Sequence, residues 1–209
     1  SAAPAPASAL SDSTASAQRG ASESGGADAP CAPILGRLHL CGQPAFVHPD
    51  GRRTPIDNKD ALLLAFLAIE GPTPRSRLAS FIWPDVDHER ARSSLRQRLF
   101  RLRRALGLDL LRDGEVTALR ADVPTDLDRP DAAAEVTLSP LLGGFEWKGN
   151  GEAGPWLASR RLQHEDTQLD WLAQRCSEYE AAGQLVAALR EAQRMIAARP
   201  TYEHAHRRL

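Results

Sequence analysis

The sequence predicts a mainly α-helical fold with small β-sheets. Apolar residues recur at helical spacing in several segments between residues 57 and 200, and short extended runs with turn residues stand at 34–56 and 109–120. The longest apolar run, ALLLAFLAI at 61–69, has nine residues. A membrane-spanning helix needs about 18 apolar residues, so we expect no membrane partner.

The chain has 209 residues, which allows one domain or two small ones. Residues 1–30 are low in complexity, because Ala, Ser, Gly and Pro make up 23 of the 30. Such a segment buries too little apolar surface to offset its ordering entropy, and we expect a disordered tail. Charge divides the remainder into two predicted domains: residues 31–129 carry a net charge of +3, and residues 130–209 a net charge of −2. The total of −1 therefore conceals a basic first domain.

The first domain begins with extended runs. Residues 34–56 predict short strands, with Pro49-Asp50-Gly51 as a turn between two of them. Asp57 or Asn58 can cap the helix that carries the apolar run, and Gly71-Pro72 stops that helix.

Two further helices follow. Thr73-Pro74 predicts the start of a short helix, with Thr as the cap and Pro in the first helical position, and Trp83-Pro84 ends it. A long helix over 88–106 then lies between a predicted cap, Asp87, and a predicted stop, Gly107.

A predicted hairpin closes the first domain. The runs LDLLR (108–112) and EVTALRA (115–121) flank Asp113-Gly114, which is a strong turn signal and predicts a hairpin over 109–120. The order is strands, helix, short helix, long basic helix and hairpin. This order predicts a winged helix-turn-helix domain with a small sheet in front of it.

The long helix is amphipathic and strongly basic. It contains seven Arg and one acidic residue, Glu89. A solvated helix normally interleaves Glu with Arg, so this charge density favours an anionic partner, with an ordinary solvated face as the alternative. An apolar stripe within about 40° of Leu95 should pack on the first two helices. The other members of this stripe are Ala91, Leu99, Leu102 and Leu106.

We interpret 88–106 as a recognition helix in the major groove of double-stranded DNA. Arg can bind guanine bidentately, Gln97 can pair with adenine, and Ser93 can reach a base or a phosphate. Flanking Arg side chains would hold phosphates in a salt-dependent manner. The candidate DNA-binding residues are Arg90, Arg92, Ser93, Arg96, Gln97, Phe100, Arg101, Arg103, Arg104 and Arg112.

Two features of this surface leave alternatives open. An outward Phe100 could touch a thymine methyl group, pack on the hairpin or be buried against the second domain. Arg112 and Arg120 flank the hairpin tip, where a wing can enter a minor groove or hold a phosphate, although an ordinary surface hairpin is the alternative. Arg75 and Arg77 are weaker candidates for contacts to the DNA backbone.

The run TPRSRLASFIWPDVDHERARSSLRQRLFRLRRALG resembles the DNA-binding domain of bacterial transcriptional activators of the Streptomyces antibiotic regulatory protein (SARP) type. In the second half, LSPLLGGFEW (138–147), Pro155-Trp156-Leu157 and the closing EHAHRRL are similar to the same family. The resemblance implies an OmpR/PhoB-like winged helix followed by a helical bacterial transcriptional activator domain. This sequence departs from the family at Ser94, where Asn is frequent, and at Phe100, where a small residue is usual.

The second half predicts two helices. Apolar residues recur at helical spacing over 153–182, Gly183 interrupts, and a helix over 185–198 ends before Pro200. The spacing of Gly, Ala and Pro is typical of half a tetratricopeptide unit, which cannot cover its own apolar face and needs a neighbour.

The resemblance implies that this helical half supports dimerisation and contact with RNA polymerase, with a packing brace for the first domain as the alternative. The family's helical domain continues further, so we expect an incomplete member of the family or the front of a larger regulator.

No motif predicts an enzyme. The chain lacks a G-x-x-x-x-G-K-[ST] loop and an H-E-x-x-H motif, and no nucleophile has an identifiable base partner. Cys31 and Cys41 lack further ligands at zinc spacing, His204 and His206 point apart on a helix, and Cys176 suits a core thiol. We therefore expect no catalytic residue, no metal and no cofactor. Three scattered cysteines favour a reducing cytosol, and the resemblance implies a bacterial cytoplasmic protein at the nucleoid.

The sequence thus predicts a sequence-specific transcriptional regulator, an activator, that binds double-stranded DNA. The alternative is a protein-interaction or sensor front end of a larger signalling protein with a degenerate winged helix. A fold in which residues 130–209 cover Phe100 and Arg101 would favour this alternative.

Overall fold

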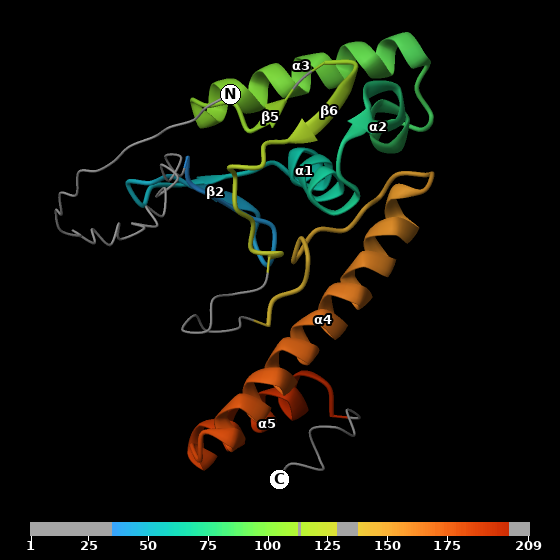
Figure 1. The fold of residues 1–209 in the computed structure, drawn as a ribbon. Helices are drawn as coiled ribbons and strands as arrows, with labels where there is room; N and C mark the ends of the chain where they lie inside the picture. Colours follow the sequence, from blue (N-terminus) through green and yellow to red (C-terminus); the bar gives the residue numbers. More distant parts are fainter. Residues whose placement is uncertain (1–34, 113, 129–137, 201–209) are drawn as a thin grey trace, which may run out of the picture. The chain divides into compact units, whose positions relative to one another are not determined.

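A computed structural model describes residues 35–112, 114–128 and 138–200. The predicted tail at 1–30, the hairpin-tip residue Asp113, Cys31 and the two histidines near residue 205 lie outside these ranges. The described part is mainly helical and contains five helices and two three-stranded antiparallel sheets, in agreement with the predicted class (Figure 1).

The front sheet has the order β1-β2-β3, with β1 at Arg37–His39, β2 at Ala45–Val47 and β3 at Arg53–Pro55. The predicted turn joins β2 to β3. Gly51 adopts a φ of 83° there and donates its N–H to the carbonyl of His48 at 2.9 Å. A side chain at this φ would be strained, which explains the Gly.

Helix α1 spans Asn58–Glu70 and is capped by Asp57, whose carboxylate accepts the N–H of Lys59. Seven consecutive residues, Ala61 to Leu67, are buried, so α1 is the central helix of the first core. Helix α2 spans Arg75–Ile82 and ends at Trp83, as predicted.

The prediction for Thr73-Pro74 is wrong in one respect. These two residues form strand β4, which pairs with β6, and α2 begins at Arg75 without a side-chain cap. Thr73 is opposite Thr117 in that pairing, and its hydroxyl donates to the carbonyl of Gly71 at 3.0 Å. Sheet pairing with a strand more than forty residues away has overridden a local capping pattern.

The second sheet has the order β4-β6-β5, with β5 at Leu111–Arg112 and β6 at Val116–Leu119. The predicted hairpin is therefore present, and β4 adds a third strand to it. Helix α3, at His88–Leu106, lies between α2 and the β5–β6 hairpin in the chain, which is the order predicted for a winged helix-turn-helix.

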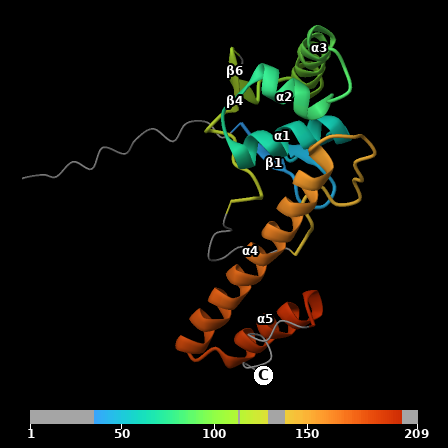
Figure 2. The same ribbon diagram turned by 90° about the vertical axis from the view of Figure 1, so that its right-hand side faces the viewer.

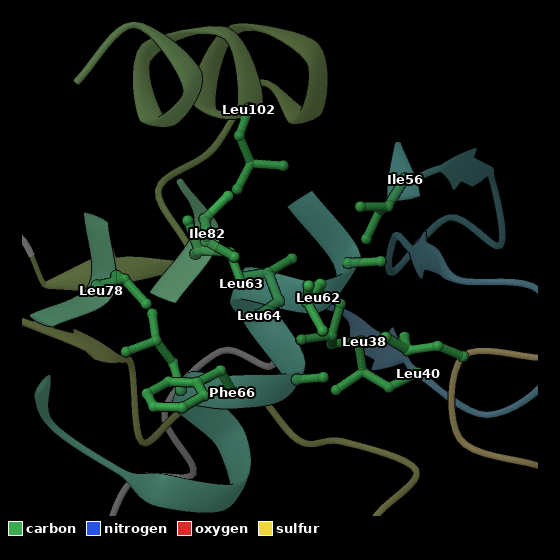
Figure 3. Close-up of a cluster of buried hydrophobic side chains, with 14 of the residues drawn as sticks. Leu38, Leu40, Ile56, Leu62, Leu63, Leu64, Phe66, Leu78, Ile82 and Leu102 are labelled. Atoms are coloured by element: carbon green, nitrogen blue, oxygen red, sulfur yellow. The ribbon is translucent and has the colours of Figure 1, made fainter. Parts of the chain in front are cut away.

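A single apolar cluster joins these elements. Leu38 and Leu40 from the front sheet, Leu62 to Phe66 from α1 and Leu102 from α3 converge in it (Figure 3). The same cluster includes Leu141, Leu142, Phe145, Ala153 and Leu157, so its members come from both sides of the division predicted at residue 130.

Helix α4 spans Ala153–Ala181 and α5 spans Leu185–Ala198, with Gly183 at φ 72° between them. The two helices lie side by side over the second half of α4 (Figures 1 and 2). A second, smaller cluster holds them together and consists of Leu169, Leu172, Cys176, Ala188, Ala192 and Met195. The small side chains of Ala188 and Ala192 allow the two helices to approach closely.

Candidate nucleic-acid interface

Both ends of α3 are fixed by local chemistry. The Asp87 carboxylate accepts the N–H groups of Glu89 at 3.1 Å and Arg90 at 3.5 Å, which satisfies two donors at the start of the helix. Gly107 adopts a left-handed conformation and returns its N–H to the carbonyl of Arg103. The helix therefore has the bounds that the sequence predicted.

The predicted apolar stripe determines which face of α3 is presented outward. Ala91, Leu95, Leu102 and Leu106 are buried, and Leu99 is partly buried against the same core. The opposite face is exposed along its length. Its candidate base-reading residues, Ser93, Gln97 and Phe100, are all exposed.

Five of the seven arginines of α3 are exposed and make no ion pair with the described residues. They are Arg90, Arg92, Arg96, Arg101 and Arg104. All five are among the predicted DNA-binding residues. Their charges repel one another across a solvent-facing surface, and an anionic partner would relieve that repulsion.

The other two arginines have acidic partners from outside the helix. Arg98 donates to Asp57 at 2.7 Å and to Asp60 at 2.8 Å, so it ties α3 to the start of α1. Burial raises the pKa of Asp60, and the opposing effect of Arg98 does not cancel this shift. The largely buried carboxylate therefore depends on its ion pair with Arg98, and Arg98 acts as a structural residue.

Arg103 is paired with Asp109. Gly107 reverses the chain after α3 and brings Asp109 back beside the last helical turn. The sequence predicted Arg103 as a DNA contact. To bind a phosphate, the Arg103 guanidinium would have to leave the Asp109 carboxylate or contact both groups at once. An Arg and an Asp six residues apart across a helix-ending Gly are the sequence pattern that points to such a pair.

Phe100 is the exposed apolar residue of this face, with 64% of its surface accessible. It lines a pocket of about 170 Å³ between α3 and the chain leading into β5, together with Leu99 and Leu108. Neither Phe100 nor Arg101 is buried by residues 138–200, so the arrangement expected for the alternative function is not present among the described residues.

The hairpin contributes one exposed arginine beside α3. Arg112, on β5, is exposed, whereas Arg120 donates to Asp122 at 2.6 Å. Arg77, one of the weaker backbone-contact candidates, is paired with Glu152 ahead of α4. Arg112 is therefore the wing residue that is best placed for an anionic ligand.

A polar cluster that the sequence did not predict joins the front sheet to α4. The Cys41 Sγ lies 3.2 Å from Nε2 of His164, and the Asp126 carboxylate accepts the N–H groups of Leu40 at 2.7 Å and Cys41 at 2.9 Å. Burial, followed by the charge of Asp126, raises the pKa of the Cys41 thiol far above its usual range. These contacts join the segment that follows β1 to helix α4.

Within the described ranges, no three His, Cys, Asp or Glu side chains are grouped so that they could hold a metal ion. The described helices likewise include none that is both long enough and apolar enough to cross a membrane. The chain matches no known protein-family model, and a search of curated proteins found no significantly similar sequence. The resemblance to the SARP-type activators therefore stays a prediction.

Proposed function

We propose that this protein is a sequence-specific transcriptional regulator that binds double-stranded DNA and acts as an activator. Helix α3 would enter the major groove, and the β5–β6 hairpin would contact the backbone or the adjacent minor groove as a wing. The activating role rests on the resemblance to the SARP-type family.

The observation that carries this proposal is the outward face of α3. Five exposed arginines, which make no ion pair with any residue that the structure describes, lie on one helix with a single acidic residue, Glu89. Ser93 and Gln97 lie exposed among them and can form hydrogen bonds with base edges. Two of the seven arginines are used by the fold, so the remaining positive charge is a property of the surface that folding does not require.

The exposed apolar side chains of α5 favour a second role for the helical half. Leu185 and Val186 are 69% and 68% exposed, and Leu189 is 42% exposed. This face supports assembly, through a second copy of the chain or through RNA polymerase. If DNA binding fails, the same face makes a protein-interaction module the better explanation of the whole chain.

Fluorescence anisotropy with labelled duplex DNA tests the proposal. We would compare the wild type with Arg96→Ala/Arg101→Ala/Arg104→Ala at low and near-physiological salt. The matched control is Arg37→Ala/Arg52→Ala/Arg190→Ala, which removes three exposed arginines far from α3 in the sequence and changes the net charge equally.

We expect wild-type binding with a steep salt dependence, loss of binding in the α3 variant and near-normal binding in the control. The slope of log K against log salt is negative, and removal of three phosphate contacts should reduce its magnitude by about 3. Equal loss in both variants would show that only net charge matters. If the wild type does not bind at low salt, the DNA-binding proposal is wrong.

A further inference from the structure

Phe100 is a large apolar residue that stands exposed in the middle of α3. The helix has its own buried stripe on the opposite side, and 64% of the Phe100 surface remains in water. Exposed apolar area of this kind is unfavourable in the free protein. A bound partner that covers the ring would recover this free energy.

The surroundings of Phe100 restrict the kind of partner. Arg96, Arg101 and Arg104 lie within one helical turn of it, and all three are exposed without an ion pair among the described residues. Leu99 and Leu108 add a small apolar shelf in the adjoining pocket. A protein partner with a wide apolar surface would have to desolvate these cations. The fitting partner is anionic and offers only a small apolar group.

Duplex DNA has both properties. Its phosphates match the arginines, and the C5-methyl group of thymine is the one apolar group that ordinary bases present in the major groove. We infer that Phe100 is a specificity-determining residue that reads the methyl group of a thymine in the bound site. This inference rests on the proposed DNA-binding function.

The helix geometry also predicts where that thymine lies. Phe100 follows Gln97 by three residues, a rise of about 4.5 Å along α3. Successive base pairs are about 3.4 Å apart. The thymine should therefore lie within about one base-pair step of the base that Gln97 contacts.

The test begins with selection of preferred duplexes from a random pool by the full chain. Each thymine of the selected site is then replaced singly by uracil, which removes the methyl group and keeps the base-pairing edge. Dissociation constants are measured for the wild type, for Phe100→Ala and for Leu162→Ala. Leu162, on α4, is 62% exposed and serves as a matched truncation of an exposed apolar residue.

At one thymine, we expect uracil to weaken wild-type binding by about 4-fold, the effect of one buried methyl group. Phe100→Ala should bind thymine and uracil equally at that position, and Leu162→Ala should keep the wild-type ratio. A Phe100→Ala variant that retains every thymine-to-uracil ratio, with the wild type still binding a preferred site, overturns the inference alone. If the wild type selects no sequence and binds no duplex, the proposed function and the inference are both wrong.

Discussion

Arg98 shows that the neighbours of an arginine in space decide whether it is available to a ligand. It stands in the same basic run as Arg96 and Arg101, yet it points to the start of α1 and pairs with Asp57 and Asp60. Its position three residues after Leu95 places it near the apolar stripe of the helix. The pairing itself could not be predicted, because the two acids lie about forty residues earlier in the sequence.

The ion pair between Arg98 and Asp60 should contribute to the stability of the fold. Arg98→Ala leaves Asp60, whose side chain is only 13% exposed, without its cationic partner, and should lower the free energy of unfolding by about 2 kcal/mol. Urea denaturation at pH 7 measures the change. Arg104→Ala is the matched control, with little effect on stability and a clear effect on DNA affinity. If both variants are equally stable, the inference that Arg98 has a structural role is wrong.

At the scale of single elements, local patterns predicted most helix ends correctly and failed at one. Asp57, Asp87 and Gly107 define helix ends by backbone chemistry within a few residues, and the structure places these ends as predicted. Thr73-Pro74 carries a capping pattern of the same type, but it pairs with β6 instead. A partner strand so distant in the sequence leaves no trace in the local pattern.

The hairpin carries the second prediction. Arg112 is exposed on β5 beside α3, and Arg112→Ala should weaken binding to all duplex sequences alike, by about 2- to 5-fold at low salt. The magnitude of the negative slope of log K against log salt should decrease by about 1. A salt titration of binding measures both quantities, with Arg52→Ala on the front-sheet turn as the control. An unchanged slope for Arg112→Ala would mean that the wing does not touch the DNA backbone.

Considered as a whole, the molecule has its first core built from both predicted domains. Trp156 of α4 lies with its ring centroid 5.2 Å from Phe66 of α1 and 5.4 Å from Phe81 of α2. Its indole N–H donates to Glu70 at 2.7 Å, and Arg160 donates to the same carboxylate at 2.6 Å. Composition and charge suggested a division near residue 130, but they cannot show which apolar residues meet across it.

This contact carries the third prediction, on pH dependence. Burial raises the pKa of Glu70, but the hydrogen bonds from Trp156 and Arg160 outweigh burial, so the pKa lies below its ordinary value of 4.5. A lowered carboxyl pKa gives stability that is fully present above pH 4.5 and is lost as the pH falls through the folded-state pKa.

Glu70→Gln should therefore be less stable than the wild type at pH 7. The expected loss is only about 1 kcal/mol, because the Glu70–Arg160 ion pair is partly exposed. The difference should narrow as the pH falls below 4.5. Urea denaturation at several pH values measures it, with Glu146→Gln as an exposed control. A stability difference between Glu70→Gln and the wild type that grows on acidification would contradict the lowered pKa of Glu70.

The joint between Cys41 and His164 also makes the thiol a chemical reporter. Alkylating reagents attack the thiolate, and burial together with Asp126 raises the pKa of this partly buried thiol, which lies against His164 of α4. We therefore expect alkylation of Cys41 to become faster when α4 separates from the segment that follows β1. The rate at which this sulfur is alkylated would therefore measure how often α4 separates from the segment after β1. The rate can be compared in the presence and absence of DNA.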